Sequence, residues 1–515
     1  MSTTLRFLGF GLAVFSAVVS GSPIAPEISV PRYFQRSPST PAVISLDQVQ
    51  NDLGRLMSNS SLIFGPSSDA YSEATDRWNT YSKPDIQVVV EVGQESDIAQ
   101  VVKYCNQNSI DFLAYSRGHG MSTTVARMKG IEINLSKLTN ITIRPDKKTA
   151  LLQGGAYADL ILGALGEIGY TAVLGANGCV GFGGLSLGGG LGRLQGQHGL
   201  VSDNVVSMNV VLANGTTIKV SDKSNSDLFW AMKGAGHNFG IVTSFEIKIY
   251  PQRSATWHYH NYLWRQDKLE DVFKALNKLQ GMGKLPARMG ASLGQISINS
   301  SISSTEPVIF WTFAYDGPAK EAEKLLADFN KIKAVVNEQG DVEYPQLLVA
   351  QETDSASASC ASLPYIGASA NLQTYNVTTQ RQLYNHFTKR LVTEPEIGAN
   401  ARLYYEGFSS LGSQAINAAS SAFPHRDEYL PVYFITPVPE GKEDAARKWA
   451  HESRDLWNQG QPLRRPTTYV NFAAGDETVE ALYGHEPWRL QRLRSLKAKY
   501  DPQNRFRWFN PIIRD

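Results

Sequence analysis

The pattern of apolar and polar positions divides the chain into two regions. Between residues 86 and 250, short β-rich runs alternate with stretches of helical spacing. Strands are predicted at 86–92, 110–115, 130–135, 149–155, 205–212 and 241–250, and helices at 96–105, 157–169 and from residue 227 onward. Ser96 is the predicted N-cap of the first helix. Strands joined by helices in this order predict an α/β region whose loops at strand ends bind a ligand.

Residues after Pro251 follow a different pattern. Runs that alternate, or that are apolar throughout, predict strands, and longer amphipathic stretches predict helices. The strands are expected at 257–264, 290–298, 307–315 and 429–437, and the helices at 268–282, 319–336 and 443–458. This mixture favours an α+β domain built on a largely antiparallel sheet. A strand at 469–472 and a basic helix at 488–500 are predicted near the end of the chain.

Length and composition are those of a two-domain globular protein. The 515 residues exceed the usual size of one hydrophobic core. Hydrophobic residues make up 42% of the chain and charged residues 19%, as in ordinary soluble domains. The 49 basic and 48 acidic residues leave a net charge of +1, so we expect no nucleic-acid partner and no membrane partner.

The N-terminus has the layout of a secretory signal peptide. Arg6 precedes a short apolar block at 7–19, and the small residues Ser20, Gly21 and Ser22 follow it. The block is too short to span a membrane comfortably, and no later stretch approaches about 18 uncharged apolar residues. We therefore expect cleavage near Gly21 and a mature protein that is secreted or lies in the lumen of the secretory pathway.

Six Asn-x-Ser/Thr sequons agree with passage through a glycosylating compartment. They begin at Asn59, Asn134, Asn140, Asn214, Asn299 and Asn376. The 3 cysteines exclude a disulfide framework but allow one bridge. Cys105 with Cys360 is the most plausible pair and leaves Cys179 free, and three buried thiols are an equally good alternative. The spacing of the cysteines does not predict a zinc site.

A glycine-rich stretch from Leu174 to Asn204 is the most unusual part of the chain. Ten glycines lie between Gly175 and Gly196 inclusive, interleaved with apolar residues that favour burial. Glycine lets the backbone approach a ligand closely and adopt positive φ. A flexible linker would instead be polar and diluted with Ser and Pro. The stretch therefore predicts a ligand cradle lined by backbone.

Two other motifs allow competing interpretations. Residues 184–188 match the G-x-S-x-G elbow of Ser hydrolases around Ser186, but the glycines that follow weaken the helix that this motif requires. Neither a strict G-x-G-x-x-G nor a P-loop motif occurs in the glycine-rich stretch. His258 and His260 would share one face of a strand, as a metal-binding pair would. Because no third ligand is suggested nearby, we expect no metal site.

His119 lies in a turn that follows a predicted strand. Residues 115–120 read Tyr-Ser-Arg-Gly-His-Gly and resemble the R-x-G-G-H type loop of the berberine-bridge-enzyme-like flavoproteins, within the vanillyl-alcohol-oxidase class. In that family the loop His carries FAD covalently, through the flavin 8α-methyl group, and His119 takes that position. Two residues depart from the motif: Tyr115 replaces its Arg, and Arg117 replaces its first Gly.

Further segments match the same family in the same order along the chain. The glycine-rich stretch resembles the family's second FAD loop. The other matching segments are 199–205, 227–231, 239–243, 423–426, 469–472 and 499–506. The resemblance implies an α+β fold, in which a PCMH-type FAD-binding domain is joined to a substrate domain with an antiparallel sheet covered by helices.

The implied organisation divides the chain into five parts. They are a signal peptide at 1–21, an N-terminal arm and the start of the FAD domain at 22–80, the FAD-binding domain at 81–252, the substrate-binding domain at 253–460, and a C-terminal berberine-bridge segment at 461–515 that returns to the FAD domain.

The resemblance also implies which residues hold FAD. They are Ser116, Arg117, Gly118, His119, Gly120, Gly175, Val180, Gly181, Gly184, Gly189, Gly190, Gly192, Gly240, Ile241 and Val242. Family members with two covalent bonds carry a Cys three residues before a Val-Gly pair, and Asn177 stands there in this chain. We therefore expect one covalent bond, through His119. Val180 takes the place of a small residue that the family associates with oxygen access, which favours an oxidase over a dehydrogenase.

The implied chemistry is transfer of a hydride from the substrate to FAD while a protein base takes a proton. Tyr469 is the first candidate for this base and Asn471 for a partner of the ring or substrate, with Tyr404, Tyr405 and Glu406 as further candidates for the base. We expect a secreted oxidase of a small alcohol, phenol or amine, with O₂ as the acceptor and H₂O₂ as a product. A carbohydrate oxidase is the alternative enzyme. From different classes, a Ser hydrolase and a flavin-fold protein acting without net redox also stay open.

Overall fold

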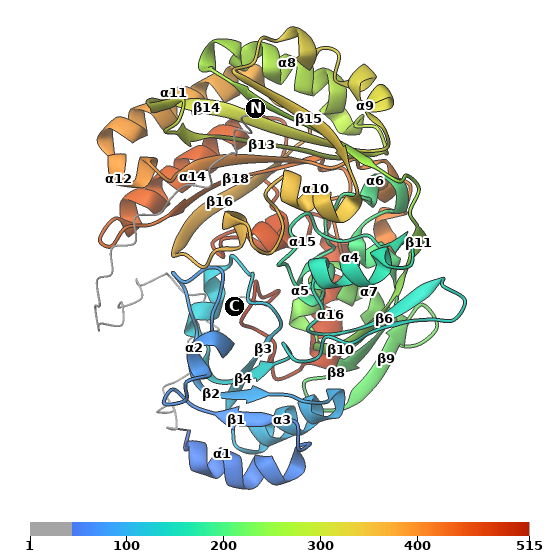
Figure 1. Ribbon diagram of the computed structural model, residues 1–515. Coiled ribbons are helices and arrows are strands. Elements are labelled where there is room, and N and C mark those ends of the chain that lie inside the picture. The colour runs from blue at the N-terminus through green and yellow to red at the C-terminus, as the bar shows by residue number, and fades with distance from the viewer. Residues whose placement is uncertain (1–43, 514–515) are drawn as a thin grey trace.

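Three principal sheets organise the chain, two small ones in its first half and a large one in its second (Figure 1). The computed structural model describes residues 44–513, so the predicted signal peptide and the first part of the N-terminal arm lie outside the described residues. Within that range, none of the helices has the length and apolar character needed to cross a membrane.

The first sheet has four strands in the order β1-β2-β4-β3. These are β1 (Leu62–Phe64), β2 (Asp85–Glu91), β3 (Asp111–Tyr115) and β4 (Lys129–Asn134). β4 pairs in parallel with both β2 and β3. Helices α1 (Leu46–Leu53) and α3 (Glu95–Gln107) bury their apolar sides with the valines and isoleucines of these strands. Because β3 is a parallel strand, its carboxyl end presents the loop at 116–120, as ligand-binding loops are presented in α/β folds.

The second sheet has five antiparallel strands in the order β5-β6-β10-β8-β9. These are β5 (Ile141–Ile143), β6 (Thr149–Gln153), β8 (Val205–Val211), β9 (Thr217–Ser221) and β10 (Ile241–Lys248). The glycine-rich stretch contains two short helices, α5 (Phe182–Leu187) and α6 (Gln195–His198). It shares one hydrophobic core with α4 (Ala158–Gly166) and α7 (Ser226–Ala235). Its leucines, Phe182 and Val201 therefore pack into that core, as a cradle requires and a linker does not.

The third sheet has seven strands in the order β15-β12-β14-β13-β17-β18-β16, and each neighbouring pair is antiparallel. Its strands are β12 (Trp257–Trp264), β13 (Met289–Asn299), β14 (Ser303–Asp316), β15 (Val336–Val342), β16 (Tyr365–Leu372), β17 (Arg402–Gly407) and β18 (Leu430–Pro437). Helices α8 (Leu269–Gln280), α9 (Ala319–Leu325), α11 (Val377–Thr393) and α14 (Glu443–Gln459) cover its outer face (Figure 1).

The two faces of this sheet have different surroundings. On β17, Leu403 and Tyr405 are buried in the core that the covering helices share. Tyr404 and Glu406 alternate with them and therefore point to the other face, toward the first half of the chain. The sheet thus separates a helix-covered face from a face that closes over the two smaller sheets.

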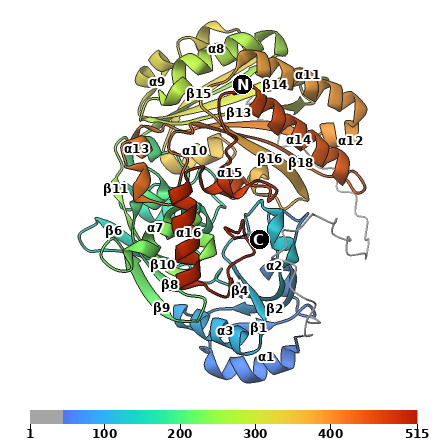
Figure 2. The same cartoon turned by 180° about the vertical axis from the view of Figure 1, so that it is seen from behind.

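The C-terminal segment crosses back to the first half of the chain. Helix α16 (Pro487–Tyr500) lies beside α7 (Figure 2), and Lys499 forms an ion pair with Asp227 at 2.7 Å. The buried Lys497 donates hydrogen bonds to the carbonyl of Asn238 and to Asp501. The remaining short elements are α2 (Tyr71–Ala74), β7 (Tyr170–Thr171), β11 (Tyr250–Pro251), α10 (Tyr344–Ala350), α12 (Pro395–Gly398), α13 (Leu411–Gln414) and α15 (Val479–Tyr483).

The strands predicted before residue 252 are all present, but three local predictions are wrong. The helix predicted at 319–336 ends at Leu325, and edge strand β15 begins at Val336, because pairing with β12 overrides helical spacing. Residues 470–472 form a 3₁₀ turn rather than a strand. Ser96 lies inside α3, whose N-cap is Gln94, and the carboxylate of Asp97 accepts the Gln94 N–H at 3.1 Å.

Candidate active site

His119 lies in the loop after β3 and presents a ring nitrogen that has no partner. The ring stacks on Trp78, with 4.7 Å between the centroids and 13° between the planes. Its Nε2 atom is buried and makes no hydrogen bond. Desolvation lowers the pKa of His119 to about 4, so the imidazole is neutral at physiological pH. A neutral ring with an open nitrogen is the form that a bond to a cofactor requires.

The loop around His119 depends on a glycine with positive φ. Gly118 has φ +64°, and a Cβ there would lie 2.6 Å from the ring of Tyr115 and 2.9 Å from the carbonyl of Asp76. The Tyr115 hydroxyl donates to that same carbonyl at 3.0 Å. Tyr115 therefore fills the space over Gly118 and helps to fix the turn. Gly120, on the other side of His119, contacts Phe509 of the C-terminal segment.

The two predicted FAD loops meet at Gly181. A Cβ on Gly181 would lie 3.0 Å from the Ser116 hydroxyl and 3.1 Å from Cγ of Arg117. Ser116 donates to the carbonyl of Gly154 at 2.9 Å. The exposed guanidinium of Arg117 lies over the ring of Tyr157, 4.4 Å from its centroid. Gly181 therefore brings the glycine-rich stretch against the histidine loop.

The predicted cofactor glycines fall into two groups. Four of them pack directly against other protein atoms, because an added Cβ would come within 2.4 Å of a neighbour. They are Gly189, Gly190, Gly192 and Gly240. Gly184 has no protein atom within 4 Å of such a Cβ, so its surroundings leave room for a ligand, and Gly175 contacts only Leu185. Ile241 and Val242 point their side chains into the core, which leaves only their backbone for a cofactor.

Two further residues of this region carry buried polar atoms without partners, and sequence reasoning missed both. Nε2 of His237 donates to the carbonyl of Gly184 at 3.1 Å, while its Nδ1 has no hydrogen bond, and burial lowers the pKa of the ring to about 4. Arg193 is 1% exposed, and its Nε and Nη1 have no hydrogen bond. The available signal for Arg193 was that no other Lys or Arg lies in the stretch from Leu174 to Asn204.

The predicted pair Tyr469 and Asn471 is brought together beside the glycine-rich stretch. The buried Tyr469 hydroxyl accepts the N–H of Gly190 at 3.1 Å and Nδ2 of Asn471 at 2.7 Å. Asn471 also donates to the carbonyl of Leu185 at 3.1 Å. A Cβ on Gly188 would lie 2.2 Å from Oδ1 of Asn471, so only glycine allows this approach. Burial raises the pKa of Tyr469, which keeps the phenol protonated and makes it a poor base.

Glu406 on β17 has the pKa that suits a base. Desolvation raises this pKa to about 7, against a hydrogen bond from Tyr433 and the charge of Arg193, which both lower it. The Tyr433 hydroxyl donates to Oε1 of Glu406 at 3.1 Å. A base is most effective when its pKa lies near the working pH. Tyr405, the neighbouring candidate on the same strand, points to the helix-covered face and donates to Gln380 at 3.0 Å, which takes it away from the site.

An aromatic wall made of two groups of contacting rings lies between His119 and Tyr469. Within its two groups, Trp78 with Tyr365 and Tyr404 to Tyr469, the centroids of contacting rings are 4.3 to 5.1 Å apart. Its members are Trp78, Tyr365, Tyr404, Tyr433, Phe472 and Tyr469. Arg402 donates to the hydroxyl of Tyr404 at 2.9 Å. The face opposite the glycine-rich stretch is therefore lined by flat apolar rings that carry a few polar groups.

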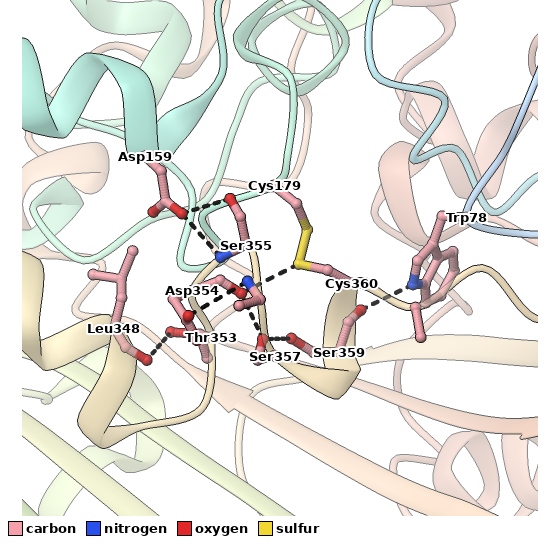
Figure 3. The surroundings of a disulfide bond; sticks show 12 residues. Trp78, Asp159, Cys179, Leu348, Thr353, Asp354, Ser355, Ser357, Ser359 and Cys360 are labelled. Atoms are coloured by element: carbon pink, nitrogen blue, oxygen red, sulfur yellow. Dashed lines mark hydrogen bonds between the residues drawn. A yellow bond between two sulfur atoms is a disulfide. The ribbon is translucent and has the colours of Figure 1, made fainter. Parts of the chain in front are cut away.

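A disulfide joins the glycine-rich stretch to the third sheet's region, and it corrects the predicted pairing. Cys179 bonds to Cys360 (Figure 3), with S–S at 2.01 Å and Cα–Cα at 6.2 Å. Cys105 is instead a buried free thiol on α3. Spacing alone could not find this pair because 181 residues separate its members. The Sγ of Cys179 is therefore not available as a second link to a cofactor.

The segment around Cys360 also holds Trp78 in place. Trp78 donates from Nε1 to the carbonyl of Ser359 at 2.9 Å (Figure 3). On the other side, the Gly178 N–H donates to the carbonyl of Thr353 at 2.7 Å. The Asp159 carboxylate, at the start of α4, accepts the N–H of Ser355 at 2.9 Å. The segment at 353–360 thus connects α4, the glycine-rich stretch and the ring stacked on His119.

Several remaining sequence predictions change with the structure. Ser186 is fully buried inside α5 and donates to the carbonyl of Gly183 at 3.1 Å, so it is no hydrolase nucleophile. Asn134 is also fully buried and bonded to the carbonyl of Ala74, so its sequon is no glycosylation site in the folded chain. The sequence suggested no third ligand near His258 and His260, but Glu323 bonds to both rings. Asn59, Asn140, Asn214 and Asn376 are exposed and Asn299 is half-buried.

Comparison with known proteins supports a flavoprotein. A family model described as an FAD binding domain matches residues 86–221, and one described as berberine and berberine-like matches residues 468–513. The FAD-linked oxidoreductase iacH of Pestalotiopsis fici is 49% identical over 99% of this chain and 98% of its own length. The FAD-linked oxidoreductase anuG of Penicillium roqueforti is 45% identical over 98% of both chains.

A solved structure shows the same fold. The glucooligosaccharide oxidase of Acremonium strictum, described with a 6-S-cysteinyl, 8α-N1-histidyl FAD, has a TM-score of 0.76 at 19% identity. The match covers 91% of this chain and 99% of that one. Fold and site together define an FAD-linked oxidoreductase. The relatives and the two family models then show that the chain belongs to the berberine-bridge-enzyme-like family.

The residues of the site fit FAD. His119 Nε2 and His237 Nδ1 are buried without partners, and the space at Gly184 is open to a ligand. Buried polar atoms are rarely left without a hydrogen bond, and these two nitrogens are available to a group that binds there. His237 donates to the carbonyl of Gly184, and the ring of Phe509 lies beside both His237 and Gly120, the neighbour of His119.

Proposed function

We propose that this protein is a secreted oxidase that removes a hydride from a small alcohol, phenol or amine, with FAD bound covalently through His119 alone and O₂ as the acceptor. The observation that carries the proposal is Glu406, a carboxyl with a pKa of about 7 on the same aromatic-lined face as Tyr469 and Asn471. Bound FAD supplies the hydride acceptor and returns the electrons to O₂, which yields H₂O₂.

The histidine loop and the glycine-rich stretch would hold the cofactor. His119 supplies the covalent attachment through its open nitrogen, and Gly184 with the backbone of Val180 and Gly181 supplies the close approach. A single attachment agrees with two observations: Asn177 stands at the family's cysteine position, and the Sγ of Cys179 is already bonded to Cys360. Val180, next to this disulfide, is the residue proposed to allow oxygen to reach the flavin.

Glu406 would take the proton from the substrate hydroxyl or amine as the hydride leaves. Burial raises its pKa, and Tyr433 orients the carboxylate through a hydrogen bond at 3.1 Å. Tyr469 stays protonated, so its hydroxyl can donate to a substrate oxygen while it accepts from Gly190 and Asn471. This assignment moves the base from Tyr469 to Glu406 and makes Tyr469 a positioning group.

The aromatic wall favours a substrate with a flat or apolar ring. A face lined by aromatic rings suits a phenol or another ring compound, such as a secondary metabolite. Aromatic faces also stack on sugars, and solved structures of this fold include oligosaccharide oxidases. A carbohydrate is therefore the second candidate substrate. A secreted location agrees with the predicted signal peptide and with the disulfide, since disulfides persist in oxidising compartments.

Peroxide release tests the proposal. Purified protein should be yellow, and the flavin absorbance should stay with the polypeptide after acid precipitation. Peroxide is then measured with a panel of aromatic alcohols, phenols, amines and oligosaccharides. We expect turnover with ring-bearing alcohols, phenols or amines, and turnover with oligosaccharides alone would select the second candidate. Flavin reduction by a substrate under anaerobic conditions, without peroxide in air, would identify a dehydrogenase and overturn the oxidase assignment.

A further inference from the structure

A cluster of metal-binding side chains lies in the third sheet, on the face covered by helices. His258 and His260 are two positions apart on β12, so their side chains point to the same face of the sheet. Glu323 of α9 contacts both of them there. Oε1 of Glu323 is 2.9 Å from Nε2 of His258 and 2.7 Å from Nδ1 of His260. The two imidazoles are 2% and 1% exposed. Three donor atoms from two elements therefore converge within 4.8 Å of one another.

Each ring is held from behind by an oxygen acceptor. Nδ1 of His258 lies 2.7 Å from Oδ1 of Asp341, and Nε2 of His260 lies 2.7 Å from Oδ1 of Asn337. Both acceptors come from edge strand β15. Metal-bound histidines typically donate their second ring N–H to a carboxylate or carbonyl oxygen, which fixes the tautomer and leaves the other nitrogen free for the metal. The cluster has this arrangement of oxygen acceptors at both rings, and the Tyr262 hydroxyl also lies 3.0 Å from Nδ1 of His260.

The carboxylate is supported in the same way. Oε2 of Glu323 accepts Nδ2 of Asn330 at 2.7 Å, and Asn330 in turn accepts the hydroxyl of Tyr262 at 2.8 Å. This bond leaves Oε1 as the atom that faces the two rings. The carboxylates of Glu323 and Asp341 would also offset the charge of a dication, so the site could hold one without burying excess charge.

We propose that His258, His260 and Glu323 bind a zinc-type divalent cation that fastens α9 and β15 to β12. Two imidazoles and one carboxylate form a donor set that zinc accepts, with water as the fourth ligand. Tetrahedral bonds of about 2.0–2.2 Å place ligand atoms about 3.3 Å apart, so Glu323 must withdraw by about half an ångström. Its side chain is 26% exposed on α9, so it is free to make this small movement and opens a path for the ion.

The role of this ion is structural rather than catalytic. The cluster faces the helix-covered side of the sheet, with Tyr262 and Phe313 of the same core, whereas Glu406 faces the other side. In the strand order, β14 and β13 separate β12 from β17, a lateral distance of about 14 Å at about 4.8 Å per strand. The ion would therefore stabilise the edge of the sheet without contacting the flavin or the substrate.

The test uses the full flavin-loaded protein, dialysed against a chelator and titrated with ZnCl₂ at pH 7.5. We expect one zinc per chain by calorimetry and elemental analysis, an increase in Tm, and unchanged flavin content. X-ray absorption at the zinc edge should show two imidazoles and oxygen ligands without sulfur. Sulfur ligands would contradict the proposed donor set, and no binding at ten-fold excess zinc would also overturn the proposal.

Two conservative variants and one control locate the site. Glu323→Gln removes the charged ligand and should abolish stoichiometric binding. Asp341→Asn keeps the ligands but weakens the hold on His258, so zinc affinity should fall 10- to 100-fold. His451→Ala is the matched control, because His451 pairs with Asp476 at 3.1 Å without a second imidazole, and it should bind zinc like the wild type. Unchanged affinity in both Glu323→Gln and Asp341→Asn contradicts the proposal.

Discussion

Cys179 and Cys360 form a disulfide that ties the glycine-rich stretch to the segment that holds Trp78 over His119. One end of this bridge lies in the proposed cofactor cradle, and the other belongs to the part of the chain that forms the third sheet. The disulfide therefore joins the regions proposed to carry the cofactor and the substrate.

Replacing both cysteines of the bridge should destabilise the protein and leave the flavin attached. In the chain-entropy model, opening a loop of 181 residues costs about 5 kcal/mol of unfolding free energy. We expect Cys179→Ser with Cys360→Ser to lower Tm by several degrees, measured by tryptophan fluorescence, while in-gel flavin fluorescence persists. Cys105→Ala is the control, since it removes a free thiol without opening a loop. Loss of covalent flavin in the double variant, with the fold intact, would show a cysteinyl link.

His119→Ala should abolish the covalent attachment of flavin. The imidazole is neutral and its Nε2 has no protein partner, so no other side chain competes for the attachment. We expect the flavin to separate from the polypeptide on acid precipitation, with circular dichroism like that of the wild type. His237→Ala serves as the comparison, because it removes a neighbouring buried imidazole. Flavin that stays covalent in His119→Ala contradicts the assignment.

Glu406 should set the pH dependence of the reaction. A base must be deprotonated, so kcat/KM should rise with pH up to the pKa of about 7 and level off above it. Glu406→Gln should lower kcat by about 10²–10⁴-fold and remove this limb of the profile. Tyr433→Phe removes a donor that stabilises the carboxylate, so the limb should move to higher pH while the flavin stays bound. An unchanged profile in Glu406→Gln would assign the base elsewhere.

The carboxyl of Glu406 should also make the free energy of unfolding depend on pH. This free energy should fall as the pH rises, whereas kcat/KM should rise. The pKa in the folded protein, about 7, lies above the ordinary value of 4.5, so the folded state holds the proton more tightly than the unfolded chain. The contribution of Glu406 is therefore fully present at low pH and is lost as the pH rises from about 4.5 to about 7. Denaturant unfolding across this range should show a decline in unfolding free energy that is smaller in Glu406→Gln. Equal declines in the two proteins would contradict the raised pKa.

Gly184→Ala tests where the cofactor lies. No protein atom approaches within 4 Å of the added methyl group, so the substitution should not strain the protein itself. If FAD fills that space, flavin loading should fall while Tm of the flavin-free protein is unchanged. Gly166→Ala in α4 is the control, since it also adds a methyl group to open space. Normal loading in Gly184→Ala would place the cofactor away from this glycine.

The sequence determined which segments form the site, because their chemistry is local. A glycine with positive φ beside His119 and small residues where two loops touch are properties of short stretches. Such properties depend on backbone sterics, so they could be predicted from the residues alone. The order of the matching family segments then indicated the fold and the cofactor.

Only the tertiary structure decided how distant groups act on one another. Three results depend on residues that are more than 60 positions apart in the sequence. They are the pairing of Cys179 with Cys360, the choice of Glu406 over Tyr469 as the base, and the approach of Glu323 to His258. Desolvation raises the pKa of Glu406 and keeps Tyr469 protonated, and desolvation depends on everything packed around a group. Composition and spacing carry no such information, because burial and long-range contacts arise only when the whole chain is folded.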